Sequence, residues 1–255
     1  MLDFSSPMVL LGDQSRLTFF VPPNTVHIWA ISLASDGTAL NTFLQTLSAD
    51  EVRRSQKFMR REDYAEFITA HGVLRHILSR YCGVRAVDLR FLRGATGKPF
   101  IERSISLGIY PHFNMAHSAG RMLLAIHGSG DVGIDLECEQ DSLDPVTIAA
   151  RYLTKAELKE ILASPDRKRR AVFLRSWVAK EAVLKACGVG LGYSLDRVEL
   201  CWASHGNSAA ATLLDSAHGE TDWTVCLLTC EPGWHAAVAA RSGQWTIVSQ
   251  TVCGC

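Results

Sequence analysis

Val132-Gly133-Ile134-Asp135-Leu136-Glu137 alternates apolar and acidic residues, so on a β-strand both carboxylates lie on one face. Trp177-Val178-Ala179-Lys180-Glu181-Ala182-Val183-Leu184-Lys185 is typical of a helix and carries a third carboxylate one turn before a lysine. Three carboxylates, with no histidine or cysteine ligand among them, suit a hard divalent cation such as Mg²⁺, and the lysine suits phosphate. Together the two stretches predict magnesium-assisted chemistry on a phosphate ester.

Each part alone also has an ordinary structural interpretation. Alternating acidic residues are common on half-exposed strands, and Glu181 with Lys185 fits a salt bridge on a helix surface. Residues 128–133 match the GxGxxG dinucleotide pattern, but they open a strand instead of a helix. We therefore interpret them as a hairpin turn. The combination of the three carboxylates and the lysine is what favours a metal site.

Composition narrows the class of protein. The chain has 255 residues, 47% of them hydrophobic, which is enough for one large domain or two small ones. Its formal net charge is zero, which argues against a nucleic-acid-coating protein. Two local basic clusters fit either solvated helix faces or anion binding: Arg53, Arg54, Lys57, Arg60 and Arg61, and then Arg167, Lys168, Arg169 and Arg170.

The sequence favours a cytoplasmic location. Residues 1–21 lack the basic start of a secretory signal, and no apolar run reaches membrane-spanning length, so we expect no membrane partner. The eight cysteines form no CxxC pair and predict reduced, mostly buried thiols. Metal binding by Cys226 with Cys230, or by Cys253 with Cys255, is the less favoured alternative.

The predicted elements fall into two groups. Capping boxes at Ser48–Glu51 and Thr154–Glu157 each predict the start of a helix. We expect strands near 27–33, 88–92, 113–115, 122–127, 132–137, 197–202, 223–230, 235–240 and 245–249. Helices are expected within 48–82, from 144, over 154–163 and over 166–187, and turns at 94–99 and 116–121. This order predicts an α+β (α/β) fold with two similar lobes, 1–130 and 131–255.

Four short motifs occur in a fixed order between residues 47 and 200. They are Gly97-Lys98-Pro99, Phe113-Asn114-x-x-His117-Ser118, Gly133-Ile134-Asp135-x-Glu137, and Trp177-x-x-Lys180-Glu181-Ala182-x-x-Lys185 with Gly188-x-Gly190-Leu191. In order and spacing the chain resembles the Sfp-type 4'-phosphopantetheinyl transferases. The form with Ala182 resembles the branch that carries KEA in place of KES.

The resemblance implies a pseudo-duplicated two-lobe fold, each lobe a small antiparallel sheet packed with helices, with coenzyme A in the cleft between them. It implies transfer of the 4'-phosphopantetheine arm of coenzyme A to a serine of an apo acyl or peptidyl carrier protein, with release of 3',5'-ADP. It further implies dependence on Mg²⁺ and a cytoplasmic, monomeric enzyme.

Residue roles follow from the same resemblance. Asp135, Glu137 and Glu181 would hold the metal, and Glu181 would also help to deprotonate the attacking serine, directly or through a water. Lys185 would lie near the pyrophosphate and assist the leaving group. Four residues match positions that contact coenzyme A: Arg54 for the 3'-phosphate, and Lys98, Pro99 and His117 for the nucleotide end.

Two departures from the family pattern affect the nucleotide end. Ala116 stands where the family often has serine, which removes one hydroxyl contact to the ligand. Glu51 stands where a related enzyme carries lysine, and Arg53 or Arg54 would have to compensate. Carrier proteins are acidic around their serine, so residues 167–170, or those following Arg121, are candidates for a complementary rim.

Two other functions fit part of the pattern. A metal-dependent hydrolase of a pyrophosphate nucleotide would use the same carboxylates, but it would cleave coenzyme A with water and need no carrier. A carrier-binding module without activity would need none of the four residues Asp135, Glu137, Glu181 and Lys185.

Overall fold

The computed structural model describes residues 1–7, 19–102, 111–140, 142, 144–214, 223–241, 243 and 245–250. Its helices are α1 (Gly37–Thr46), α2 (Ala49–Ser55), α3 (Arg61–Cys82), α4 (Pro145–Tyr152), α5 (Lys155–Ala163) and α6 (Asp166–Cys187). Short 3₁₀ turns cover Ala86–Asp88, Gly190–Gly192 and Leu195–Arg197. Within these residues, no helix is long and apolar enough to cross a membrane.

The strands form two main sheets and a small hairpin. They are β1 (Thr25–Ser32), β2 (Phe91–Arg93), β3 (Pro99–Ile101), β4 (His112–Ser118), β5 (Arg121–His127), β6 (Val132–Cys138), β7 (Val198–Trp202), β8 (Ser208–Leu213), β9 (Trp223–Leu228), β10 (Trp234–Arg241) and β11 (Thr246–Gln250). The sheet orders are β11-β1-β5-β4 and β6-β10-β9-β8-β7, and β2 pairs with β3. The molecule therefore has the predicted α+β fold.

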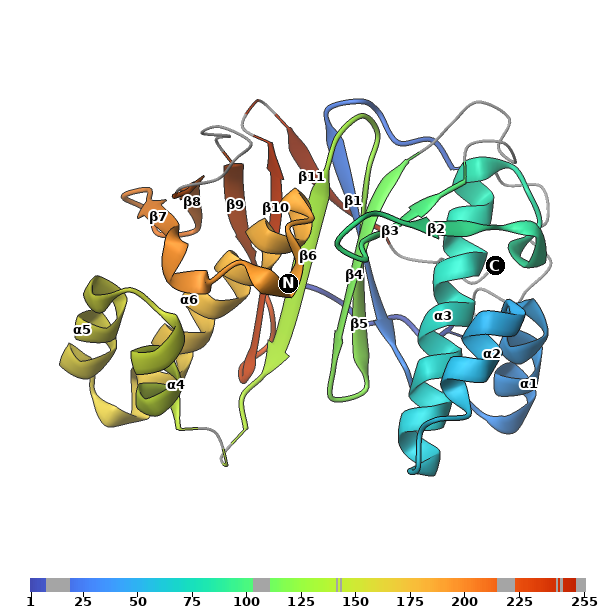
Figure 1. Cartoon of the computed structure of the whole chain (residues 1–255), viewed down its shortest axis with the longest axis horizontal. Helices are drawn as coiled ribbons and strands as arrows, with labels where there is room; N and C mark the ends of the chain where they lie inside the picture. The colour runs from blue at the N-terminus through green and yellow to red at the C-terminus, as the bar shows by residue number, and fades with distance from the viewer. Residues whose placement is uncertain are drawn as a thin grey trace.

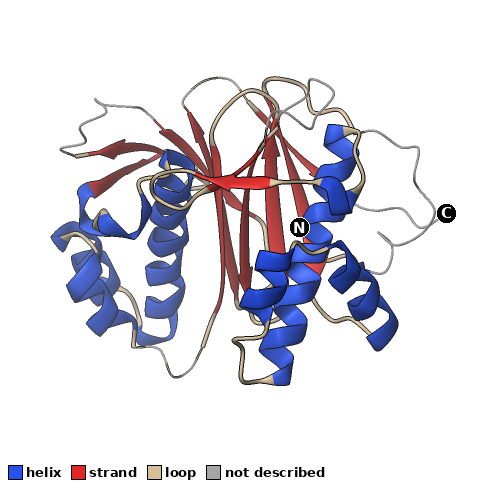
Figure 2. Ribbon diagram, turned by 45° about the vertical axis from the view of Figure 1, so that its right-hand side comes forward, coloured by secondary structure: helices blue, strands red, loops and turns tan. Residues whose placement is uncertain are grey.

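The two main sheets lie side by side in the centre of the molecule, with α1–α3 on one flank and α4–α6 on the other (Figure 1). Turning the molecule by 45° shows both helix groups in front of the strands (Figure 2). Strands β4 and β6 bring the sheets together: the Asn114 side-chain oxygen accepts a hydrogen bond from the Ile134 backbone N–H at 2.9 Å. One apolar cluster also combines residues of both sheets, among them Ile28, Leu123 and Ile134.

Helix α6 packs unusually close to the second sheet. A Cβ added to Gly133 on β6 would collide with the backbone oxygen of Ala182 and the backbone nitrogen of Ala186. The helix ends at Gly188, whose φ of 66° suits glycine at a helix C-terminus. Gly133 therefore sets how near the residues of α6 come to the acidic strand.

Most of the predicted elements are confirmed, including both capping boxes and the ends of α3 and α6. The predicted turn over 116–121 is too long. Ala119 (φ 42°) and Gly120 (φ 76°) alone form the turn, since two positive φ values suit a two-residue hairpin. His117 and Ser118 therefore lie on β4 itself.

One other prediction is wrong, and some elements were not predicted. The strand expected over 88–92 is a 3₁₀ turn followed by β2, and helix α1, strand β3 and strand β8 were not predicted. The last strand, β11, pairs in parallel with β1 of the first sheet, although it follows the second sheet in the chain. The lobe boundary near residue 130 stays a prediction. Six cysteines are free thiols, and Cys253 and Cys255 lie outside the described residues.

Candidate active site

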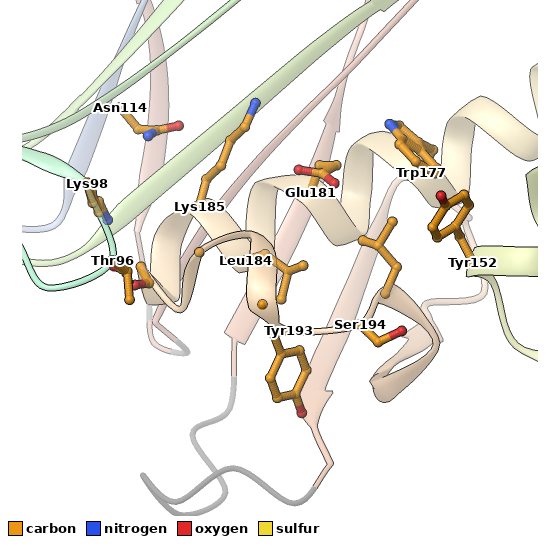
Figure 3. A pocket seen from close by; sticks show the side chains of 14 residues that line it. Thr96, Lys98, Asn114, Tyr152, Trp177, Glu181, Leu184, Lys185, Tyr193 and Ser194 are labelled. Atoms are coloured by element: carbon orange, nitrogen blue, oxygen red, sulfur yellow. The ribbon is translucent and has the colours of Figure 1, made fainter.

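The acidic strand and α6 face each other across the site. Gly133, Asp135 and Glu137 alternate along β6 and share the face that packs on α6, since side chains at every second position point the same way. Glu181 and Lys185 lie one turn apart on α6. Figure 3 shows both side chains on the same side of that helix. The predicted carboxylates and lysine are thus brought to one place by strand and helix periodicity.

Asp135 and Lys185 form the tightest contact there. Lys185 Nζ donates to Asp135 Oδ1 at 2.5 Å, and Asp135 is 4% exposed. The second carboxylate oxygen, Oδ2, is buried and has no hydrogen-bond partner among the described residues. A buried carboxylate oxygen without a partner is costly, so this atom fits a ligand that supplies positive charge.

Burial acts on all three carboxylates, and the Asp135 charge acts on the other two. Burial raises the pKa of Asp135 above its usual value, although Lys185 opposes this. Burial and the Asp135 charge raise the pKa of Glu137 and of Glu181. A divalent cation would offset both effects, and an all-oxygen donor set suits Mg²⁺. Within the part of the chain that the structure describes, no three acidic, His or Cys side chains already converge as a complete metal site.

Strand β4 adds two polar side chains beside the carboxylates. Ser118 Oγ donates to Glu137 Oε2 at 3.3 Å. Partial burial lowers the pKa of His117, and the positive charges of His71 and Lys185 lower it further. His117 on β4 is thus within electrostatic range of His71 on α3 and Lys185 on α6, but it lines neither of the two cavities described below.

Lys98 sits in the loop of the β2–β3 hairpin and ties it to the second sheet. Its Nζ donates to the backbone oxygens of Val132 at 3.2 Å and Ala186 at 2.8 Å. The Ala186 oxygen is at the end of α6, where a helix leaves its last carbonyls without internal partners. Burial lowers the pKa of Lys98. The lysine therefore holds the hairpin over the helix end.

Two cavities flank this hairpin. The larger, about 610 Å³, is lined by α6 and the loop after it (Figure 3); its walls include Lys98, Asn114, Tyr152, Trp177, Glu181 and Lys185. The smaller, about 460 Å³, is lined by residues that include Lys98, Pro99, His112 and Asp131. Cavities of this size accept small organic ligands. The predicted residues Lys98, Glu181 and Lys185 thus line one cavity, and Pro99 lines its neighbour.

Arg54 does not line either cavity. It lies on α2, where its guanidinium is 5.3 Å from the centre of the Phe67 ring. The same ring stacks on His71 with centroids 4.1 Å apart. Arg54 therefore lies beside Phe67 and His71, outside the lining of both cavities.

The sequence analysis assigned no role to Lys180, although this residue lies within the motif that begins at Trp177. Its side chain is fully buried, 2.5 Å from Glu157 Oε2, and donates to the backbone oxygen of Leu195 at 3.1 Å. The same Glu157 caps α5 through Thr154. The sequence did contain a signal for this role. Lys180 falls at the helical spacing of the apolar residues Phe173, Trp177 and Leu184, which predicts that it is buried, and a buried lysine needs a partner.

Comparison with known proteins identifies the class of protein. Residues 131–239 match the family model described as "4'-phosphopantetheinyl transferase superfamily". The 4'-phosphopantetheinyl transferase HetI of Nostoc sp. is 31% identical over 233 residues, which cover 88% of this chain and 93% of the relative. The chain belongs to this superfamily.

Two further proteins are similar to the chain. The 4'-phosphopantetheinyl transferase Sfp of Bacillus subtilis is 26% identical over 200 residues, covering 78% of this chain and 84% of Sfp. Among solved structures, holo-[acyl-carrier-protein] synthase (AcpS) of Thermotoga maritima is 25% identical with a TM-score of 0.35, and the match covers 44% of this chain and 62% of that one. The similarity to HetI extends over nearly the whole chain, so it includes the site described above.

Proposed function

We propose that the protein transfers the 4'-phosphopantetheine arm of coenzyme A to a serine of an apo acyl or peptidyl carrier protein and releases 3',5'-ADP. Because the chain belongs to this superfamily, one observation is enough to support the proposal. Glu181 and Lys185 line a cavity of about 610 Å³ one turn apart, and Lys185 pairs there with Asp135 of the acidic strand.

Asp135, Glu137 and Glu181 would hold Mg²⁺. The buried Oδ2 of Asp135, which has no hydrogen-bond partner among the described residues, supports this assignment. When bound, the ion would neutralise charge on the pyrophosphate and orient it. Phosphoryl transfer asks the protein mainly for positioning and electrostatic stabilisation, which is what this donor set offers.

Glu181 and Lys185 would carry out the protein's part of the transfer. The serine oxygen forms a bond to the phosphorus that carries pantetheine, and the bond from that phosphorus to the bridging oxygen breaks. Glu181 takes the serine proton, directly or through a water, and 3',5'-ADP leaves with the bridging oxygen. Lys185 stabilises the negative charge that develops on the leaving phosphate.

The nucleotide end of coenzyme A would lie along the β2–β3 hairpin and β4, in contact with Pro99 and His117. Lys98 has three N–H donors and uses two on backbone oxygens, so one remains for a ligand oxygen. Arg54 would meet the 3'-phosphate. We place the lobe boundary near residue 130, between this nucleotide side and the metal side.

The partner would be an acidic carrier protein, which residues 167–170 or the region after Arg121 would meet by charge complementarity. We expect the enzyme to act as a cytoplasmic monomer, without nucleic acid or membrane. Incubation with coenzyme A, Mg²⁺ and an apo carrier tests the proposal: intact-mass measurement should show one phosphopantetheine on the carrier. Cleavage of coenzyme A without a carrier would favour the hydrolase.

A further inference from the structure

Strands β4 and β6 are the facing edges of the two main sheets, and no backbone ladder joins them in the part of the chain that the structure describes. Side chains of β4 bridge this seam instead. His112 Nδ1 donates to Asp131 Oδ1 at 3.3 Å, and Asn114 Oδ1 accepts a hydrogen bond from the Ile134 backbone N–H at 2.9 Å. Polar side chains therefore hold the two edges in position.

Ser118 makes a third contact across the seam. Its Oγ donates to Glu137 Oε2 at 3.3 Å. Residues 112, 114 and 118 contact residues 131, 134 and 137 in that order, so β4 and β6 run in the same direction here. Of these three contacts, the one made by Ser118 ends on a carboxylate that the proposed function assigns to Mg²⁺.

The backbone is fixed at both ends of this contact. Ser118 is the last residue of β4 and pairs with Arg121 across the two-residue turn. Glu137 pairs with His235 on β10, and the ring of His235 is itself engaged with Glu139 at 2.8 Å. The hydrogen bond from Ser118 thus ties Glu137 to the opposite sheet.

The hydroxyl of Ser118 selects one oxygen of the carboxylate. A serine hydroxyl has one hydrogen, which is directed at Oε2, and this leaves Oε1 of Glu137 for another ligand. At 3.3 Å the bond is longer than the distance of about 2.7–2.8 Å that is usual between a hydroxyl and an oxygen acceptor. It therefore orients the carboxylate more than it stabilises the fold.

We propose that Ser118 is a positioning residue that holds the Glu137 carboxylate in the orientation that binds Mg²⁺. The identity of the ion rests on the proposed function. A hydrogen bond to a ligating carboxylate sets its orientation and raises the affinity for the metal. Because Ser118 and Glu137 belong to different sheets, the affinity for Mg²⁺ also depends on the alignment of β4 with β6.

Calorimetric titration with Mg²⁺, with and without coenzyme A and always without a carrier, tests the proposal. Ser118→Ala should weaken Mg²⁺ binding about 10- to 100-fold, as for the loss of other hydrogen bonds to metal ligands. Ser118→Thr keeps the hydroxyl and suits a strand, so it should bind Mg²⁺ nearly as wild type does. In the transfer assay, Ser118→Ala should need more Mg²⁺ for half-maximal rate by the same factor, while the rate at saturating Mg²⁺ stays unchanged.

Ser129→Ala is the matched control. The Ser129 hydroxyl also donates a hydrogen bond, to the backbone oxygen of Pro23 at 2.6 Å, but it precedes the far end of β6, so Mg²⁺ binding should not change. Without metal, both alanine variants should melt at the same temperature as wild type.

Three results would overturn the proposal: unchanged Mg²⁺ affinity in Ser118→Ala, no recovery in Ser118→Thr, or a wild type that binds no Mg²⁺ under either condition. A metal-free Ser118→Ala that melts well below Ser129→Ala would also overturn it, because the role of the hydroxyl would then be structural. The expected affinities, together with no transfer to any apo carrier, would overturn the proposed function alone.

Discussion

Lys185 Nζ lies 2.5 Å from Asp135 Oδ1, so helix α6 and the acidic strand β6 meet in an ion pair inside the candidate site. In the proposed function the same aspartate holds Mg²⁺ and the same lysine meets the pyrophosphate. If the proposed function holds, the ammonium would stand in for the cation at Asp135 Oδ1 until the substrate binds. Metal and lysine would then compete for this carboxylate before coenzyme A binds.

Lys185→Met should tighten Mg²⁺ binding to the protein without coenzyme A severalfold, because Asp135 loses its competing cation. The same change should lower the rate of transfer by about 10²-fold, by comparison with the loss of other preorganised charge-stabilising groups. Calorimetry with Mg²⁺ and a transfer assay measure the two effects. Lys155→Met, an exposed position on α5, is the control. Weaker or unchanged Mg²⁺ binding in Lys185→Met would refute the competition.

Gly133→Ala should destabilise the protein by about 1–3 kcal/mol or more, because the new methyl group forces β6 away from α6. Thermal unfolding measures the loss. At Gly37, where an added Cβ meets nothing within 4 Å and φ is not positive, alanine should be neutral or slightly stabilising. Equal melting temperatures for the two variants would argue against the close packing of β6 on α6.

Lys180→Met should destabilise the fold by about 3 kcal/mol, since it leaves the Glu157 carboxylate without its buried partner. The double variant Lys180→Met with Glu157→Gln should recover part of this loss. Denaturant unfolding of the wild type, both single variants and the double variant gives the coupling energy. Strictly additive effects would show that the pair does not stabilise the contact between α5 and α6.

The free energy of unfolding should fall in two separate pH ranges as the solution is acidified. Burial, with the nearby Arg80 charge, lowers the pKa of His76 to about 4, so the unfolded chain binds a proton there between pH 6.5 and 4 that the folded chain does not. Burial opposes ionisation of Glu51, but hydrogen bonds from His71 and Arg75 outweigh it and lower its pKa to about 2. Stability from Glu51 is therefore lost between pH 4.5 and 2.

Melting temperatures measured from pH 7 to 3 report the loss of stability in both pH ranges. His76→Gln should reduce the decline above pH 4, and Glu51→Gln the decline below pH 4.5. His205→Gln, at an exposed position, is the control for the first pH range. A wild-type melting temperature that stays constant from pH 7 to 4 would contradict the role of His76.

The core of the candidate site could be predicted from sequence because it depends on local periodicity. Alternation on β6 places Asp135 with Glu137, and the helical repeat places Glu181 with Lys185. His117 was predicted in the turn over 116–121, but the turn is shorter and the residue lies on β4. The family resemblance, not periodicity, supplied the roles of these residues.

Other features depend on contacts between distant parts of the chain. The pairing of β11 with β1 joins residues more than 200 positions apart, which no local pattern indicates. Strand β8 has three consecutive alanines, and alanine favours helix, so tertiary pairing decides its conformation. The orientation of His71 depends on Glu51, twenty residues earlier in the chain. Such contacts became visible only in the folded structure.

The most direct measurement compares wild type with Glu181→Gln, each incubated with coenzyme A, Mg²⁺ and an apo carrier protein, followed by intact-mass analysis of the carrier. The proposed function predicts one phosphopantetheine on the carrier with wild type and none with Glu181→Gln, while circular dichroism shows both proteins folded. Glu160→Gln, an exposed carboxylate on α5, should match wild type. An unmodified carrier with wild type across several carriers would contradict the function, and near-normal transfer by Glu181→Gln would contradict the role of Glu181.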